Sequence, residues 1–189
     1  MDDKYQDQQK IPSQSMDLLR RVKGRVITKF IKKLKWEPDD FLKTFGLTEN
    51  QIFEYGYGAL FIELDAEMVI GLSCISKKIS VSVFSADAGQ VEEELVAPAW
   101  INCSDKKYSK ACWANVIGKR IDSLGIIKLH DSNYEGDDGL YERGIVFILN
   151  SGNFVFTHAL ADAGPMDTVV MEFDELKPDI VKGMSIIMV

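Results

Sequence analysis

The chain has 189 residues, 46% of them hydrophobic and 10% aromatic, and a formal net charge of −7. This length and composition fit one soluble globular domain and leave little room for two separate cores. No apolar run approaches the roughly 20 residues that span a bilayer, and the polar residues 1–6 lack the apolar core of a signal peptide. We therefore expect a cytoplasmic protein that does not bind membranes.

The charge is unevenly distributed along the chain. Residues 1–35 hold ten Lys and Arg against four Asp, a formal charge of +6, which leaves −13 for the remainder. An acidic body repels nucleic acid and attracts basic proteins. The sequence thus predicts a basic protein partner and no nucleic-acid partner, with the basic face solvated or neutralised within the molecule. That face consists of Arg20, Arg21, Lys23, Arg25, Lys29, Lys32, Lys33 and Lys35.

The three cysteines, Cys74, Cys103 and Cys112, form no Cys-x-x-Cys pair. An odd number without that spacing indicates neither a disulfide framework nor a zinc knuckle. We expect buried, reduced thiols.

The predicted elements of the first half begin after a polar tail over residues 1–11. Pro12–Ser15 provides start signals for a helix that ends near Gly24. A strand over about 25–34 follows, because its residues are rich in Val, Ile and Phe. Short helical turns are expected at residues 38–40 and 48–49.

Two stretches, residues 58–72 and 144–158, have the pattern of β-hairpins. Each joins two runs rich in β-branched and aromatic residues through a short turn. Sliding one stretch by 86 positions pairs Phe61 with Phe147 and needs no gap. We therefore predict that the second hairpin repeats the first. The turns are Asp65-Ala66-Glu67 and Asn150-Ser151-Gly152-Asn153.

A second match, with an offset of 94, relates the segments that precede the hairpins. It aligns Leu19 with Trp113 and Gly24 with Gly118. The second of these segments predicts a helix capped at Ser104-Asp105, followed by a strand. Alternating runs after each hairpin, at 79–84 and 168–173, predict one further strand in each half.

Together these patterns predict an α+β fold with mainly antiparallel sheet. A single domain, 1–189, would contain two tandem helix-strand-hairpin-strand repeats, at about 12–89 and 106–175, and a C-terminal strand over 180–189. Each half alone offers too little apolar area to offset chain entropy, so the halves should pack around a pseudo-twofold axis. Trp113 and Phe147 are the expected core residues.

Residues able to carry chemistry are few. His130 and His158 are the only imidazoles, and neither has a recognisable ligand spacing or nucleophile triad. The acidic loop after His130 lacks the alternate-position spacing of an EF-hand, and Gly56-Tyr57-Gly58 precedes a hairpin rather than a phosphate-binding helix. We expect no enzyme activity, no metal and no cofactor. Two alternatives stay open: a small metal-dependent hydrolase that uses His158 and Asp162, and a ligand-binding module with a groove between the repeats.

Three features resemble a known class of proteins: the helix bearing Trp113, the step Ile117-Gly118-Lys119-Arg120-Ile121, and the hairpin end Phe156-Thr157-His158-Ala159-Leu160. This pattern is similar to that of immunity proteins of bacterial polymorphic or contact-dependent toxin systems. The resemblance implies a non-enzymatic protein that binds a cognate toxin and blocks it. The acidic charge would steer such a protein to a basic toxin domain, such as a nuclease.

Clustered carboxylates are the candidate partner-binding residues, because an unpaired acidic loop destabilises a fold slightly unless it meets a basic partner. One cluster lies between the repeats and the other in the loop of the second repeat. They are Glu92, Glu93, Glu94, Asp131, Glu135, Asp137, Asp138 and Glu142.

Overall fold

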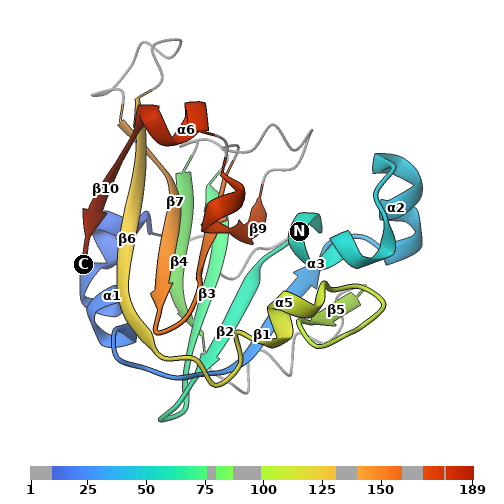
Figure 1. The fold of residues 1–189 in the computed structure, drawn as a ribbon, viewed down its shortest axis with the longest axis horizontal. Helices are drawn as coiled ribbons and strands as arrows, with labels where there is room; N and C mark the ends of the chain where they lie inside the picture. The colour runs from blue at the N-terminus through green and yellow to red at the C-terminus, as the bar shows by residue number, and fades with distance from the viewer. Residues whose placement is uncertain (1–9, 76–79, 87–98, 131–139, 159–167, 177) are drawn as a thin grey trace.

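The computed structural model describes residues 10–75, 80–86, 99–130, 140–158, 168–176 and 178–189. Short helices accompany two five-stranded antiparallel sheets, which confirms the α+β class (Figure 1). The helical elements are η1 (Pro12–Ser15), α1 (Met16–Val22), α2 (Pro38–Phe45), η2 (Glu49–Gln51), α3 (Ile52–Tyr55), α5 (Ala111–Ala114), η4 (Phe173–Glu175) and α6 (Pro178–Gly183). None of these helices is long and apolar enough to cross a membrane.

Each sheet is built mainly from one half of the chain. The first has the order β4-β3-β2-β1-β5, and the second has the order β10-β6-β7-β8-β9. The strands of the first sheet are β1 (Ile27–Leu34), β2 (Leu60–Leu64), β3 (Met68–Ile75), β4 (Ser80–Ala86) and β5 (Ala99–Asn102). Those of the second are β6 (Ile121–His130), β7 (Leu140–Leu149), β8 (Asn153–Thr157), β9 (Val169–Glu172) and β10 (Met184–Met188). The expected C-terminal strand is therefore an edge strand of the second sheet.

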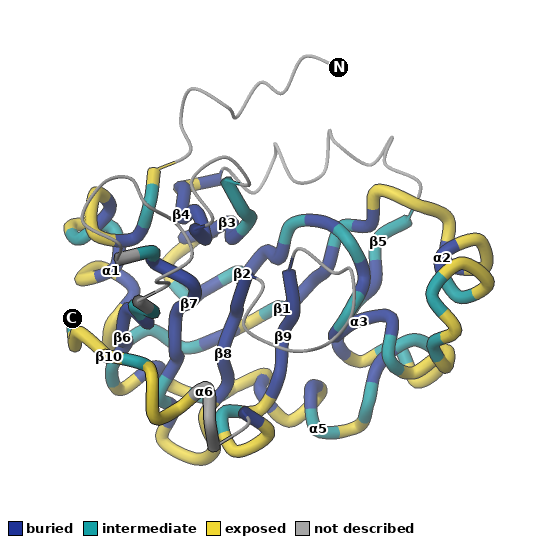
Figure 2. Tube along the Cα trace, turned by 90° about the horizontal axis from the view of Figure 1, so that it is seen from above, coloured by how far each residue is buried: buried dark blue, intermediate teal, exposed yellow. Residues whose placement is uncertain are grey.

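The largest core cluster lies between the two sheets, which form two layers (Figure 2). Phe30 of β1 contacts Phe154 of β8, with ring centroids 5.1 Å apart. Trp113 and Phe147, the expected core residues, are 1% and 0% exposed. The outer faces carry smaller apolar clusters, so several strands are buried on both faces.

Helix α1 lies between the edge strands of the two sheets. At its start, Ser15 Oγ donates a hydrogen bond to the carbonyl oxygen of Val83 in β4. At its end, Lys23 Nζ donates one to the carbonyl oxygen of Val189, next to β10. Leu19 and Val22 are fully buried, so this short helix covers one side of the core.

Reciprocal backbone hydrogen bonds join the starts of β1 and β6. Gly24 N donates to Ile121 O at 2.7 Å, and Gly118 N donates to Ile27 O at 2.8 Å. Both glycines have positive φ, of 83° and 80°. The offset of 94 matches Gly24 with Gly118 and Ile27 with Ile121, so it maps each of these two bonds onto the other, as a twofold relation between the halves would. The tandem repeat itself stays a prediction.

The ungapped match of the two hairpins is wrong in its first arm. In β2, Phe61 pairs with Gly71 and lies in the outer cluster of the first sheet. In β7, Phe147 pairs with Phe154 and lies in the core between the sheets. A shift of one residue moves a strand's side chains to the opposite face, so an offset of 86 aligns residues on different faces. The two turns differ in length by one residue.

The predicted helix beginning at Ser104-Asp105 is shorter than expected. The carboxylate of Asp105 accepts a hydrogen bond from Lys107 N, and its carbonyl oxygen accepts one from Ser109 N. Such local bonds favour turns over a helix. Only Ala111–Ala114 forms an α-helical segment.

Candidate functional site

A buried carboxylate, that of Glu54 in α3, lies at one side of the core. Glu54 is 1% exposed. Its Oε1 accepts hydrogen bonds from Trp113 Nε1 at 3.0 Å and from Lys110 Nζ at 2.8 Å. Its Oε2 has no hydrogen-bond partner among the described residues. Burial raises the pKa of Glu54, and the hydrogen bonds from Lys110 and Trp113 oppose this shift.

Lys32 of β1 reaches the same region from inside the core. It is 0% exposed, and its Nζ donates a hydrogen bond to the carbonyl oxygen of Glu54 at 3.2 Å. Burial lowers the pKa of Lys32 to about 7, although the negative charges of Glu54 and Cys74 oppose the shift. Of the two predicted alternatives for the basic face, solvation is therefore wrong for Lys32, whose ammonium group interacts with Glu54 inside the molecule.

Other members of the basic face lie at the surface. Arg20 pairs with Asp17 at 3.0 Å, and Lys29 pairs with Glu63 at 3.0 Å. These ion pairs agree with partial neutralisation within the molecule.

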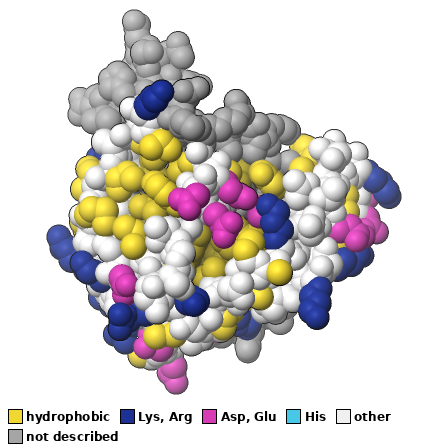
Figure 3. All heavy atoms as spheres, viewed as in Figure 1, with side chains coloured by type: hydrophobic (Ala, Val, Ile, Leu, Met, Phe, Trp, Pro, Cys, Tyr) yellow, Lys and Arg dark blue, Asp and Glu magenta, His cyan; other side chains and the backbone are white. Residues whose placement is uncertain are grey.

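Lys110 connects the buried carboxylate to the surface. Besides Glu54, its Nζ lies 3.7 Å from a carboxylate oxygen of Glu175 in η4. Glu175 is exposed, as are Glu172 and Asp174, and we call these three residues the carboxylate rim. Figure 3 shows carboxylates gathered over β9 and η4. The ion pairs of Lys110 thus hold α3 and η4 together beneath an acidic surface.

A groove of about 630 Å³ lies beside this cluster and is lined by Cys112, Trp113, Phe154 and Glu172 among others. Burial raises the pKa of the Cys112 thiol, and the negative charge of Glu172 raises it further. A raised pKa disfavours the thiolate, which is the nucleophilic form.

None of the three cysteines forms a disulfide. Only Cys103 is buried, and burial raises its pKa to about 11. Cys74 and Cys112 are half-buried, so the prediction of buried thiols holds for one of the three.

Most of the predicted partner-binding carboxylates fall outside the described residues. Glu92, Glu93 and Glu94 belong to one segment for which the structure gives no description, and Asp131, Glu135, Asp137 and Asp138 to another. Their role stays a prediction.

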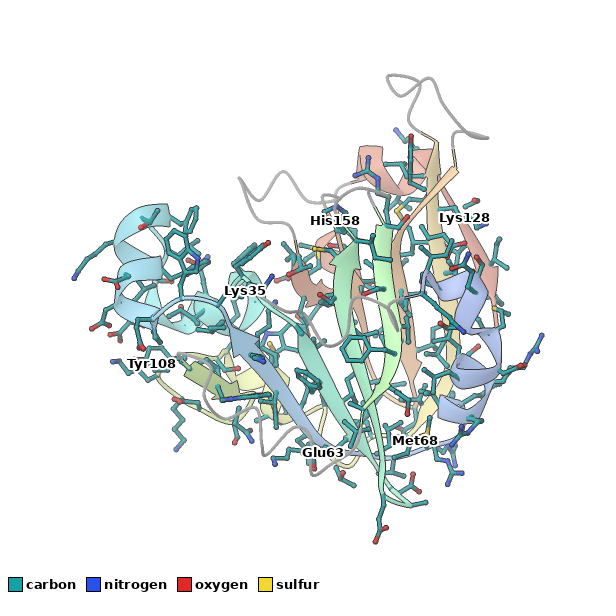
Figure 4. All side chains as sticks on the ribbon, turned by 180° about the vertical axis from the view of Figure 1, so that it is seen from behind. Lys35, Glu63, Met68, Tyr108, Lys128 and His158 are labelled. Carbon is teal, nitrogen blue, oxygen red and sulfur yellow. The ribbon has the colours of Figure 1, made fainter. Side chains whose placement is uncertain are left out.

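Glu142 is described, and the prediction that it lies in an exposed acidic loop is wrong. It lies in β7 and is 3% exposed. Its carboxylate lies 3.3 Å from Lys128 Nζ of β6 and accepts a hydrogen bond from Ser13 N at 2.8 Å. Figure 4 shows Lys128 in the second sheet. Since its charge is already paired within the molecule, Glu142 is a structural residue.

The hydrolase alternative rested on His158 and Asp162. His158 lies just after β8 and is 5% exposed, and its backbone N–H donates to the carbonyl oxygen of Arg143 at 2.8 Å (Figure 4). Asp162 lies outside the described residues. Within the described ranges, no group of three His, Cys, Asp or Glu could hold a metal ion.

Several of the residues that carry the resemblance to immunity proteins serve packing or a turn in this fold, whereas Ile117 and Arg120 are exposed. Trp113, Phe156, Thr157 and His158 are all buried. Gly118 adopts a φ of 80°, which favours glycine. These residues therefore shape the core and do not mark a binding surface.

Comparisons with known proteins give no further guidance, because no protein family, curated protein or solved structure matches this chain.

Proposed function

We propose that this protein is a non-enzymatic immunity protein that binds and neutralises a cognate toxin domain with a basic surface. The observation that carries the proposal is the charge distribution, with −13 on the chain after residue 35. Such a field accelerates encounter with a basic protein and opposes binding of nucleic acid. The resemblance of the sequence to immunity proteins supports the same function. A cytoplasmic location would let the protein meet a toxin that enters or is made in the cell.

The carboxylate rim supports the proposal from the described surface. Glu172, Asp174 and Glu175 are exposed, and Lys110 is the one cation that the described ion pairs bring to them. Side chains on short, well-anchored elements are less costly to order on binding than those on free loops. We therefore include the carboxylate rim with the acidic segments as a candidate contact surface.

A growth experiment tests the proposed function. The protein is co-produced in bacterial cells with the product of each reading frame beside its gene, and survival is compared with cells that lack the protein. Protection, together with a purified one-to-one complex, is the expected result. A neighbouring protein that is toxic but neither bound nor neutralised would contradict the proposal.

Charge reversal then locates the contact surface. Replacing Glu135, Asp137 and Asp138 by Lys should weaken toxin binding by more than about tenfold, or about 1.4 kcal/mol. If these charges are exposed, as the sequence predicts, the melting temperature should stay nearly unchanged, because exposed charges contribute little to stability. The matched variant reverses Glu172, Asp174 and Glu175. Calorimetry at two salt concentrations measures the toxin affinity of each variant and shows which surface contributes to binding. Unaltered affinity in both variants would exclude both surfaces from the interface.

A further inference from the structure

The edge of the second sheet at β10 differs from the other described sheet edges. On the edge strand β4, Val83 pairs with Lys10 and accepts a hydrogen bond from Ser15. On the opposite edge of the second sheet, β9 packs against α3. Strand β5 has only four residues. Covering and shortening edge strands are ways in which proteins prevent unwanted pairing. Strand β10 has five residues, and within the described ranges no backbone hydrogen bond from another element reaches Met184–Met188 on the side away from β6.

The backbone of β10 leaves donors and acceptors directed away from β6. Val189 N donates to Leu124 O at 2.9 Å. Antiparallel pairs alternate between bonded and non-bonded positions, so Ile187 and Ser185 also bond to β6. Met184, Ile186 and Met188 therefore direct their N–H and C=O groups outward. No described residue supplies partners for these groups.

The side chains of β10 are apolar and partly exposed on both faces. Ile186 and Met188 lie over Gly125 of β6, on the outer face of the second sheet. Ile187 alternates to the other face. These three side chains are 38%, 51% and 45% exposed, respectively. Figure 3 shows hydrophobic side chains gathered over β10 and the neighbouring strands. Both faces of β10 are therefore only partly covered within the described part of the chain.

We propose that the β10 strands of two copies of this chain pair antiparallel about a twofold axis through Ile186. In this register Met184 faces Met188 of the other copy, and Ser185 faces Ile187. The outward-directed N–H and C=O groups at 184, 186 and 188 then bond one another, as antiparallel pairing requires. The two five-stranded sheets become one continuous sheet.

The sequence of β10 favours a second copy as the occupant. Met184-Ser185-Ile186-Ile187-Met188 contains no charged residue, so self-pairing brings no like charges together. It is also nearly symmetric about its centre, which suits an isologous interface. A basic partner would find no carboxylate in this strand, so the dimer surface is separate from the acidic surfaces of the proposed function.

A single pair of five-residue strands is small beside the roughly 800 Å² per partner of a standard interface. The expected dimer is therefore weak, and its population should rise steeply with protein concentration. Sedimentation velocity over a concentration series of the full chain measures this population.

Substitutions at Ile186 test the register. Lys at this position places two like charges on the twofold axis, and so does Asp. Ile186→Lys and Ile186→Asp should each raise the dissociation constant at least about tenfold. An equimolar mixture of the two should restore the dimer, because opposite charges then meet at position 186. Val181→Lys, at an exposed apolar position of α6, is the matched control and should dimerise as the original chain does.

Circular dichroism first establishes that each variant is folded. A wild-type chain that stays monomeric at the highest attainable concentration overturns the proposal, including where it binds an added β-strand peptide instead. Dimerisation of Ile186→Lys at the wild-type affinity also overturns it. Monomeric single variants whose mixture fails to dimerise overturn the pairing through Ile186.

Discussion

Lys32 illustrates how one residue can depart from the pattern of its segment. Its neighbours in β1, Lys29 and Lys33, are half-buried, whereas Lys32 is enclosed in the core. The offset of 94 matches Lys32 with Ile126, which belongs to the largest core cluster. An ammonium group at such a position loses its hydration, and one hydrogen bond to Glu54 O replaces only part of it. This loss of hydration disfavours the charged form and lowers the pKa of Lys32.

The pKa of Lys32 predicts a specific pH dependence of stability. Because its pKa is about 7 in the folded state and 10.5 in the reference state, the unfolded chain binds more protons between these values. The free energy of unfolding should therefore gain a contribution that rises from about pH 7 toward pH 10.5, by at most about 1.4 kcal/mol per pH unit. Lys32→Met removes the titrating group and should flatten this rise, as measured by urea unfolding at several pH values. Lys29→Met is the control and should keep the original slope; an unchanged slope in Lys32→Met would contradict the assignment.

At the scale of elements, the positions of most strands along the chain could be predicted from the sequence, but β5 and the register of the strands could not. The turns at 65–67 and 150–153 and the alternating run at 168–173 lie where the structure places turns and β9. Adjacent apolar residues such as Phe61-Ile62 and Phe147-Ile148 do not indicate which of the two faces the core, because apolar clusters cover both faces of these strands. The register of the strands therefore could not be predicted. Strands buried on both faces lose the apolar-polar alternation that reveals which side faces the core.

The candidate site around Glu54 could not be predicted from sequence patterns either. Glu54 lies between Phe53 and Tyr55 in a four-residue helix, and its partners Lys110 and Trp113 lie more than fifty positions later. Nothing near Glu54 in the sequence marks it as buried. Its environment comes from the packing of α3 against α5 and the segment before it, which only the tertiary structure specifies.

The contrast between Glu142 and the acidic segment before it in the sequence can be tested by charge reversal. Glu142→Lys would place a second cation beside Lys128 in a buried position and remove the acceptor for Ser13 N. Breaking a buried ion pair typically costs about 3 to 5 kcal/mol, so the melting temperature should fall by many degrees. The loop variant with Glu135, Asp137 and Asp138 reversed is the comparison and should melt near the original temperature. Equal melting temperatures for the two variants would show that Glu142 is not a structural residue.

At the scale of the whole molecule, the main core depends on both halves of the chain. Ile62 and Ile70 of the first sheet and Phe147 and Phe156 of the second belong to one buried cluster. The hydrogen bonds between Gly24 and Ile121 and between Gly118 and Ile27 add a backbone connection. Removing either sheet would expose the inner face of the other.

A fragment that ends near Gly89 should therefore fail to fold. It keeps β1 to β4 but loses β5 and the whole second sheet, so Phe30, Ile62 and Ile70 lose the apolar surface that covers them. The remaining burial should not offset the conformational entropy of about 1 to 2 kcal/mol per ordered residue. Thermal scanning by circular dichroism and amide NMR dispersion measure the outcome, with the full chain as the control. A cooperative transition and dispersed amide signals in the fragment alone would mean that the first half is an independent domain, and the chain would then contain two folding units rather than one.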